Sequence, residues 1–272
     1  MKLCGHTMGT PGRDIYGAID LFAQLGLQGI EIRCADKGHI DLEALTRTSA
    51  QSILAHAQSR GIQVACLTPY YKDFGSDQAA AETLEGFRKA CRAAGWLQCG
   101  LVRAMGGIWP VAGMRREDVW ARTVDGLRRA GDIAAQAGVR LAVENHIGTL
   151  TMSAGDTARL VLDVDHPSVG ILLDYYWNLV AGDEDPEQAI RVQADHILHC
   201  HVKNMVWRDG EHTTVLLEDG IIDWRVVIAC LRETGYEAYL SDEYEKFWKP
   251  EFPEPEIGMR RNAEHLRRCL AD

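Results

Sequence analysis

The chain has 272 residues, of which 46% are hydrophobic and 25% are charged, a composition typical of a folded globular protein. Its 29 Lys and Arg residues against 39 Asp and Glu residues give a formal net charge of −10, which disfavours nucleic acid as a partner. No apolar run approaches the roughly 18 residues of a membrane helix, and the first residues lack the apolar part of a signal peptide, so we expect a cytoplasmic protein with no membrane partner.

Short β-rich runs recur at intervals of about thirty residues, each followed by a segment with helical periodicity. Most of the runs are apolar at nearly every position, which is typical of parallel strands covered on both faces. Eight strands are predicted, at residues 2–6, 29–33, 62–67, 100–103, 139–144, 169–174, 197–202 and 238–243. The helices between them are predicted at residues 14–25, 41–59, 78–94, 115–136, 154–164, 186–194, 224–234 and 255–270.

Glycines separate several predicted helices from the next strand. Gly26, Gly61, Gly138 and Gly235 stand at such points, where the positive φ of a helix C-cap costs glycine little. Eight βα units predict a (β/α)8 TIM barrel that spans residues 1–272 as one domain, since such barrels need roughly 250 residues. An open doubly wound sheet usually carries a Gly-rich phosphate loop, and the sequence contains no G-x-G-x-x-G or Walker A stretch.

The longest irregular stretches are predicted at residues 70–76, 106–113 and 205–222. They follow the third, fourth and seventh strands, on the face where barrel enzymes carry their sites, and are expected to form substrate loops. The eight cysteines are scattered without a C-x-x-C pair, which indicates reduced thiols. Cys4, Cys34, Cys66 and Cys200 are expected to act as small core hydrophobes.

Four side chains that can bind a metal lie at the ends of the last four predicted strands, namely Glu144, Asp174, His201 and Glu243. Neighbouring parallel strands lie about 4.8 Å apart, so side chains at matching heights can converge on one point. Three carboxylates and one imidazole suit Mn²⁺, Mg²⁺, Co²⁺ or Zn²⁺, with positions left open for substrate oxygens. We therefore predict one divalent ion as cofactor, with manganese as the first choice.

At this point the sequence resembles the xylose isomerase-like barrel superfamily, the sugar phosphate isomerases and epimerases. The resemblance covers nearly the whole chain and rests on AIDLFAQLGLQGIEIR, LAVENH, VGILLD, HCHVKN and the closing DGIIDW and LRETGYEAYLSDEYE. It implies that Glu144, Asp174, His201 and Glu243 bind the metal. It also implies that Glu144 and Glu243 face a carbon with an acidic hydrogen, as base on one side and acid on the other.

The expected function is isomerisation or epimerisation of a keto-sugar, keto-inositol or related polyhydroxy carbonyl compound through a metal-stabilised enediolate. Metal coordination lowers the pKa of the C–H beside the carbonyl, and a carboxylate can then remove the proton. Returning the proton to the neighbouring carbon isomerises the compound, and returning it to the opposite face epimerises it. Expulsion of a β-hydroxyl instead makes the enzyme a lyase, as in an inosose dehydratase or an enzyme that processes 3-keto-glycosides.

Further side chains are predicted to bind substrate. Lys203 could stabilise an enolate oxygen or form a salt bridge, and His146 follows Glu144 by two residues at the mouth of the site. His199 lies on the same strand face as His201, and the resemblance favours His201 as the ligand; a role for His199 in orienting that ligand is the lesser alternative.

The first two strands end in His6 and Arg33, which could meet the far end of a polar substrate. Tyr70, Trp109 and Trp177 could form an apolar wall against a sugar face, or simply pack the loops. Many ketose epimerases of the superfamily carry a His three residues after the sixth-strand Asp, whereas Trp177 stands there in this chain. A close ketose 3-epimerase is therefore disfavoured.

Two other classes of function compete. An abasic-site endonuclease of the same superfamily needs additional histidines that this sequence lacks, and the acidic charge disfavours duplex binding. A non-catalytic sugar or metal binder would not need both Glu144 and Glu243. The expected partner is a small carbohydrate, and association into a homo-oligomer is left open.

Overall fold

Eight parallel strands pair side by side into a closed barrel, which confirms the predicted (β/α)8 fold. This is a computed structural model that describes residues 1–272 apart from 36, 184 and 272. Strand β1 closes the ring by pairing with β10, where Cys4 lies opposite Ser241. The barrel strands are β1 (Lys2–His6), β2 (Gly29–Arg33), β3 (Gln63–Thr68), β4 (Leu101–Met105), β5 (Arg140–Glu144), β6 (Val169–Asp174), β7 (Ile197–Val202) and β10 (Tyr239–Asp242).

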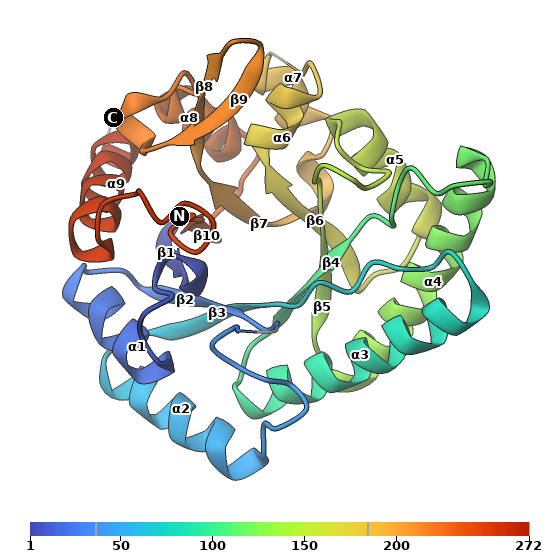
Figure 1. The fold of residues 1–272 in the computed structure, drawn as a ribbon, viewed down its shortest axis with the longest axis horizontal. Helices are drawn as coiled ribbons and strands as arrows, with labels where there is room; N and C mark the ends of the chain where they lie inside the picture. The colour runs from blue at the N-terminus through green and yellow to red at the C-terminus, as the bar shows by residue number, and fades with distance from the viewer. Residues whose placement is uncertain (36, 184, 272) are drawn as a thin grey trace.

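The helices surround this ring, and Figure 1 shows them following one another around its outside. Their apolar faces pack against the strands in one continuous core. All four glycines predicted to end helices have positive φ, between 68° and 78°. The helices are α1 (Ile15–Gln24), α2 (Arg47–Ser59), α3 (Asp77–Trp96), α4 (Arg116–Ala137), α5 (Ala154–Val164), α6 (Tyr175–Val180), α7 (Pro186–Arg191), α8 (Trp224–Glu233) and α9 (Pro255–Ala271).

The prediction of an irregular stretch at residues 205–222 was wrong. Most of it is an antiparallel hairpin of β8 (Asn204–Arg208) and β9 (Glu211–Val215), followed by a short 3-10 helix at Leu217–Asp219. The turn residues Asp209 and Gly210 both have positive φ, which is the conformation that an Asp-Gly hairpin turn adopts. The hairpin follows β7 after one residue and therefore stands at the mouth of the barrel.

Two helix predictions also need correction, and one helix was not predicted. The helix expected at residues 41–59 begins only at Arg47, because the Thr46 side chain caps it by accepting from the Ser49 backbone N–H. The helix expected at residues 186–194 ends at Arg191, and a 3-10 turn leads from there into β7. Helix α6 was not predicted; it begins directly after β6, with Asp174 as its cap.

The barrel interior changes from apolar to polar along its axis. Cys66, Leu101, Ala142 and Leu172 form an apolar layer. Charged side chains point into the barrel nearer the carboxyl ends of the strands, and each of them is at most 2% exposed: Glu31, Arg103, Glu144, Asp174, His199 and His201. Buried charge needs partners, so this layer is where the fold concentrates its ionic interactions.

The cysteines are free thiols, and seven of the eight are buried, including the four expected in the core. In the described part of the chain, no helix is both long enough and apolar enough to span a bilayer.

Candidate metal centre and substrate site at the barrel mouth

The four predicted metal ligands converge at the carboxyl end of the barrel. Glu144 and Asp174 end β5 and β6, His201 lies in β7 opposite Asp174, and Glu243 follows β10 directly. One ligand atom from each of the four lies within 4.8 Å of the other three. All four side chains are buried, Glu243 being the most exposed at 6%.

His201 occupies the middle of this cluster. Its Nδ1 lies 2.9 Å from Glu144 Oε1 and 3.5 Å from Glu243 Oε2. Burial alone would lower the pKa of His201, but Glu31, Glu243 and Glu144 raise it well above its usual value. Without a metal ion the ring is therefore held as an imidazolium between carboxylates.

Lys203 reaches the same cluster from the junction between β7 and the hairpin. Its Nζ lies 2.7 Å from Asp174 Oδ2 and 2.6 Å from Glu243 Oε2. It also lies 5.1 Å from the ring centres of both Tyr176 and Trp177. Burial would lower the pKa of Lys203, but Asp174 and Glu243 raise it well above its usual value, so the amine is an ammonium ion.

Arg103 contacts the cluster from β4 and was not predicted. Its Nη1 donates to Glu144 Oε2 at 2.9 Å, and its other nitrogens donate to the Pro69 carbonyl. Burial would raise the pKa of Glu144, but Arg103 and His201 hold it well below its usual range. A charged residue inside the otherwise apolar run GLVRAM was the sequence signal that could have found Arg103.

Glu31 is a second residue that the sequence prediction missed. It projects from β2 and lies 2.8 Å from His199 Nε2 and 2.9 Å from His201 Nε2. Thr68 Oγ1 donates to it at 2.6 Å. Its signal is the acidic residue within the apolar strand GIEIR, whose five residues are all buried.

The donor set fits a divalent cation. Glu31, Glu144, Asp174 and Glu243 are four buried carboxylates, and they face two buried cations, Lys203 and Arg103. With neutral histidines, two negative charges stay unbalanced, which is the charge that one divalent ion supplies. Three carboxylates and one imidazole around a common point also match the ligand preferences of first-row divalent metals.

The residues predicted for the far end of the substrate, His6 and Arg33, are the last residues of β1 and β2. His6 is fully buried with its ring 5.8 Å from that of His201, and burial lowers its pKa to about 4. Arg33 donates from Nε to the Tyr70 hydroxyl at 3.2 Å and lies over the ring of Phe247. The Tyr70 ring in turn lies 4.4 Å from the guanidinium carbon of Arg103.

An aromatic wall lies on the opposite side, at the start of α6. The Trp177 ring packs against His146 at 4.9 Å and against His212 of the hairpin at 5.3 Å. The Tyr176 hydroxyl lies 2.8 Å from His212 Nδ1, which ties the hairpin to α6. Trp177 and His146 are thus brought together at the mouth, and Tyr176 and His212 join them without having been predicted.

Trp109 is the predicted substrate residue that the structure leaves apart from this cluster. It is half-buried in the loop after β4, where its backbone N–H donates to the Gly148 carbonyl. Among the described contacts, none joins its ring to the residues around His201.

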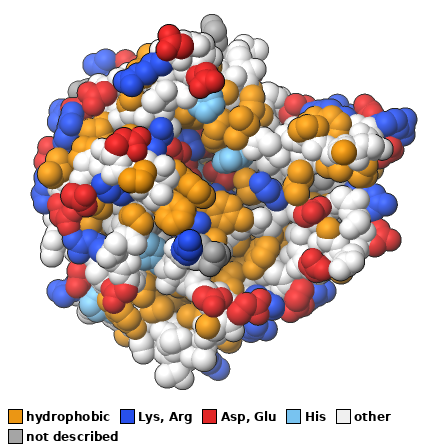
Figure 2. Space-filling view, in the orientation of Figure 1, with side chains coloured by type: hydrophobic (Ala, Val, Ile, Leu, Met, Phe, Trp, Pro, Cys, Tyr) orange, Lys and Arg blue, Asp and Glu red, His pale blue; other side chains and the backbone are white. Residues whose placement is uncertain are grey.

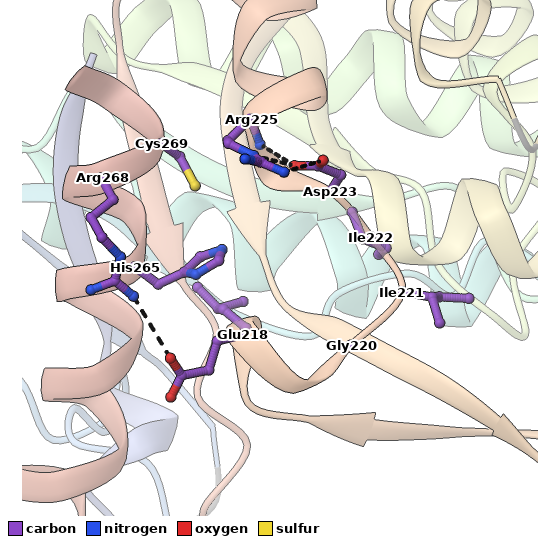
Figure 3. Close-up of a pocket in the computed structure, with 10 residues that line it drawn as sticks. Glu218, Gly220, Ile221, Ile222, Asp223, Arg225, His265, Arg268 and Cys269 are labelled. Atoms are coloured by element: carbon purple, nitrogen blue, oxygen red, sulfur yellow. Dashed lines mark hydrogen bonds and ion pairs between the residues drawn. The ribbon is translucent and has the colours of Figure 1, made fainter. Parts of the chain in front are cut away.

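The face shown in Figure 2 has a hollow near its middle, where histidine and acidic side chains are visible between hydrophobic ones. A different pocket, of about 380 Å³, lies between the segment that follows the hairpin and α9 (Figure 3). Its ionic side chains pair with one another, Arg225 with Asp223 and Arg268 with Glu218. That pocket therefore offers weaker support for a reaction than the barrel mouth.

The sequence profile of the family described as xylose isomerase-like TIM barrel matches residues 19–269. Among curated proteins, the chain is 29% identical over 145 residues to an inosose dehydratase from Lacticaseibacillus casei, covering 48% of each protein. The chain spans about half the length of the curated relatives it matches.

Solved structures share the fold over nearly the full length. The probable 3-DHS dehydratase AsbF from Bacillus anthracis superposes with a TM-score of 0.82 at 20% identity, over 98% of this chain and 99% of that one. The IolI protein with a bound zinc atom superposes with a TM-score of 0.80 at 22% identity, over 100% of this chain and 97% of that one.

Proposed function

The chain belongs to the xylose isomerase-like TIM barrel family, and on that premise we propose that it is a divalent-metal-dependent enzyme that removes a proton beside the carbonyl group of a polyhydroxy compound. The observation that carries this proposal is the convergence of Glu144, Asp174, His201 and Glu243 within 4.8 Å at the barrel mouth. We assign these four residues as the metal ligands. The zinc atom of the similarly folded IolI protein supports a divalent ion, and manganese is our first choice for this chain.

A divalent ion bound there would polarise the substrate carbonyl and make the neighbouring C–H more acidic. The chain must then supply a base. Glu243 is the better placed of the two glutamates, because its ion pairs with Lys203 and His201 both run through Oε2 and leave Oε1 without an ion pair among the described residues. In Glu144, by contrast, both oxygens are engaged, one by His201 and one by Arg103.

Lys203 and the aromatic wall have supporting roles in this proposal. The Lys203 ammonium lies where it can hold a negative oxygen of the substrate after proton removal. Trp177, His146 and Tyr176 offer ring faces to the apolar face of a sugar or inositol and exclude water from the site. His6 and Arg33 remain proposed contacts for the far end of the substrate, and Trp109 is the weakest of the substrate assignments.

Return of the proton gives an isomerase or epimerase, which is the first candidate because a second carboxylate, Glu144, lies in the same cluster. A dehydratase is the second candidate, supported by the 29% identity to an inosose dehydratase over about half of the chain. In that reaction Glu243 takes the proton from carbon, the C–O bond to the β-hydroxyl breaks, and the hydroxyl leaves as water with the proton that Glu243 returns to it.

The test is incubation of the metal-loaded protein in D2O with a panel of ketoses, inososes and 3-keto-glycosides. We expect deuterium to enter one carbon of at least one compound, as measured by proton NMR. The same spectra separate the candidates. Isomers and epimers keep every hydroxyl group of the substrate, whereas dehydration yields an unsaturated product. If metal-loaded protein leaves every compound unlabelled and unchanged, the proposed chemistry is wrong for these substrate classes.

A further inference from the structure

Glu31 stands outside the four proposed ligands and yet contacts the one histidine among them. It lies on β2, which is separated from β7 in the barrel by β1 and β10. Its side chain is fully buried, and both of its oxygens are engaged by ring nitrogens or a hydroxyl. A buried carboxylate that makes no contact with solvent must be satisfied by these groups alone.

The contacts determine where protons reside on the histidines. An ionised carboxylate only accepts hydrogen bonds. Three groups converge on the two oxygens of Glu31, namely the Thr68 hydroxyl, His201 Nε2 and His199 Nε2, which is the arrangement of an ionised carboxylate that accepts from each of them. His201 Nε2 and His199 Nε2 therefore both carry a proton that they donate to Glu31, at 2.9 Å and 2.8 Å.

A neutral imidazole with its proton on Nε2 presents a lone pair at Nδ1. In His201 this nitrogen faces Glu144 and Glu243, the side on which the other proposed ligands lie. Thr68 adds a hydrogen bond to the same Glu31 oxygen that His201 contacts, which holds the carboxylate in place.

We propose that Glu31 is a positioning residue that fixes the tautomer and ring orientation of His201 and so presents Nδ1 to the metal. The inference rests on the metal centre of the proposed function. Residues that hold a metal-binding histidine by its second nitrogen typically change metal affinity by 10- to 100-fold when they are removed. Glu31 holds the Nε2 atom of His201 from β2, which is not a neighbour of β7 in the barrel.

One alternative is that Glu31, His199 and His201 hold a second metal ion, because they too offer atoms within 4.8 Å of one another. Two observations disfavour it. Thr68 already donates to the Glu31 oxygen that His201 contacts, so that oxygen has two hydrogen-bond partners without an ion. A second ion would also require His201 to give up the protons on both of its nitrogens.

The experiment compares metal binding by wild-type protein and Glu31→Gln. Calorimetric titration of the metal-free proteins with ZnCl2 should give one ion per chain in both, bound roughly 10- to 100-fold more weakly by the variant. A glutamine must turn a donor toward one of the two histidines, so the His201 tautomer is no longer enforced. Long-range 1H–15N NMR of histidine-labelled, zinc-loaded protein should show His201 ligated through Nδ1 in wild type and a weakened or mixed signature in the variant.

Two threonine variants provide the controls. Thr68→Val removes the hydroxyl that supports Glu31 and should weaken zinc binding about two- to tenfold, the worth of one hydrogen bond. Thr123→Val changes an equally buried threonine on α4, outside this network, and should leave the affinity unchanged. If Glu31→Gln does not fold, as judged by circular dichroism, Thr68→Val decides the question.

Wild-type zinc affinity and an unchanged His201 signature in Glu31→Gln would overturn the inference, as would wild-type affinity in Thr68→Val if only that variant folds. Two zinc ions in wild type and one in the variant would instead establish the second metal site. A wild-type protein that binds no zinc would refute both this inference and the metal centre beneath it. Normal zinc binding without deuterium exchange would refute the proposed activity and leave the role of Glu31 standing.

Discussion

Lys203 and Glu243 form a buried ion pair, with Nζ 2.6 Å from Oε2, inside the cluster of proposed metal ligands. The same ammonium contacts Asp174 at 2.7 Å, so one side-chain cation is shared by two of the four ligands. A lysine in this place and a metal ion compete for the same carboxylates, and the competition can be measured.

Replacement of Lys203 by methionine should destabilise the metal-free protein by about 3–5 kcal/mol, because it leaves buried carboxylates without their partner. The same change should strengthen metal binding, since the ion then meets uncompensated carboxylates. Chemical denaturation with and without zinc measures both effects. Equal zinc affinity in wild type and Lys203→Met would show that the ammonium does not compete with the ion.

Glu243→Gln should lower turnover by roughly 10²-fold or more while zinc or manganese stays bound, because general base catalysis is typically worth 10²- to 10⁴-fold. The amide keeps one oxygen for the metal but cannot accept a proton. In the same samples of Glu243→Gln, deuterium exchange should therefore fall while metal content stays unchanged.

Glu245→Gln is the matched control, since Glu245 lies two residues farther on, 3.8 Å from Lys203. It should retain most of the activity. If exchange in metal-saturated protein survives both Glu243→Gln and Glu144→Gln, neither glutamate is the base, and His146 becomes a better candidate than Lys203, whose amine is already protonated.

Removal of the metal with a chelator should abolish deuterium exchange, and Mn²⁺ should restore it better than Ca²⁺. Ca²⁺ prefers six to eight oxygen ligands, whereas this cluster includes an imidazole and four donor side chains. Full exchange in the presence of excess chelator, with metal content checked by mass spectrometry, would contradict a metal mechanism.

Metal binding should release protons and weaken as the pH falls. The raised pKa of His201 means that the metal-free ring is doubly protonated at neutral pH, so an ion at Nδ1 must displace a proton. Below that pKa each ion should release about one proton, and its affinity should fall about tenfold per pH unit. Burial raises the pKa of Asp174 to about 7, so a second proton should add to the slope below that pH.

Calorimetry in buffers of different ionisation enthalpy counts these protons. An affinity that is constant over the neutral range would mean that the His201 imidazolium does not exist in the metal-free protein.

The sequence predicted the barrel and its four-residue cluster because strand ends are visible in the periodicity of apolar residues. Glu144 and Asp174 stand where an apolar run stops, and the geometry of parallel strands places such positions side by side. Glu31 and Arg103 were missed for the opposite reason. Each lies within a strand, and the partners that justify its burial come from distant strands.

The hairpin was missed although its Asp209-Gly210 turn is a recognised signal. Its flanking residues include Arg208 and Glu211, which are exposed and polar, so the segment lacks the alternation of apolar and polar residues that indicates a half-buried strand. The contacts of His212 with Tyr176 and Trp177 depend on how the hairpin folds back over α6, which local sequence does not encode.

The pairing of β1 with β10 has a consequence for how the molecule opens. The cluster takes side chains from β5, β6, β7 and the segment after β10, and Glu31 supports it from β2, so no contiguous part of the chain holds the complete site. An ion bound only by the closed ring must be released before any of these strands can separate. We therefore expect that, in the metal-loaded protein, these strands open together in one cooperative transition. Hydrogen exchange at the backbone amides of β5 and β10 should then slow to a similar extent.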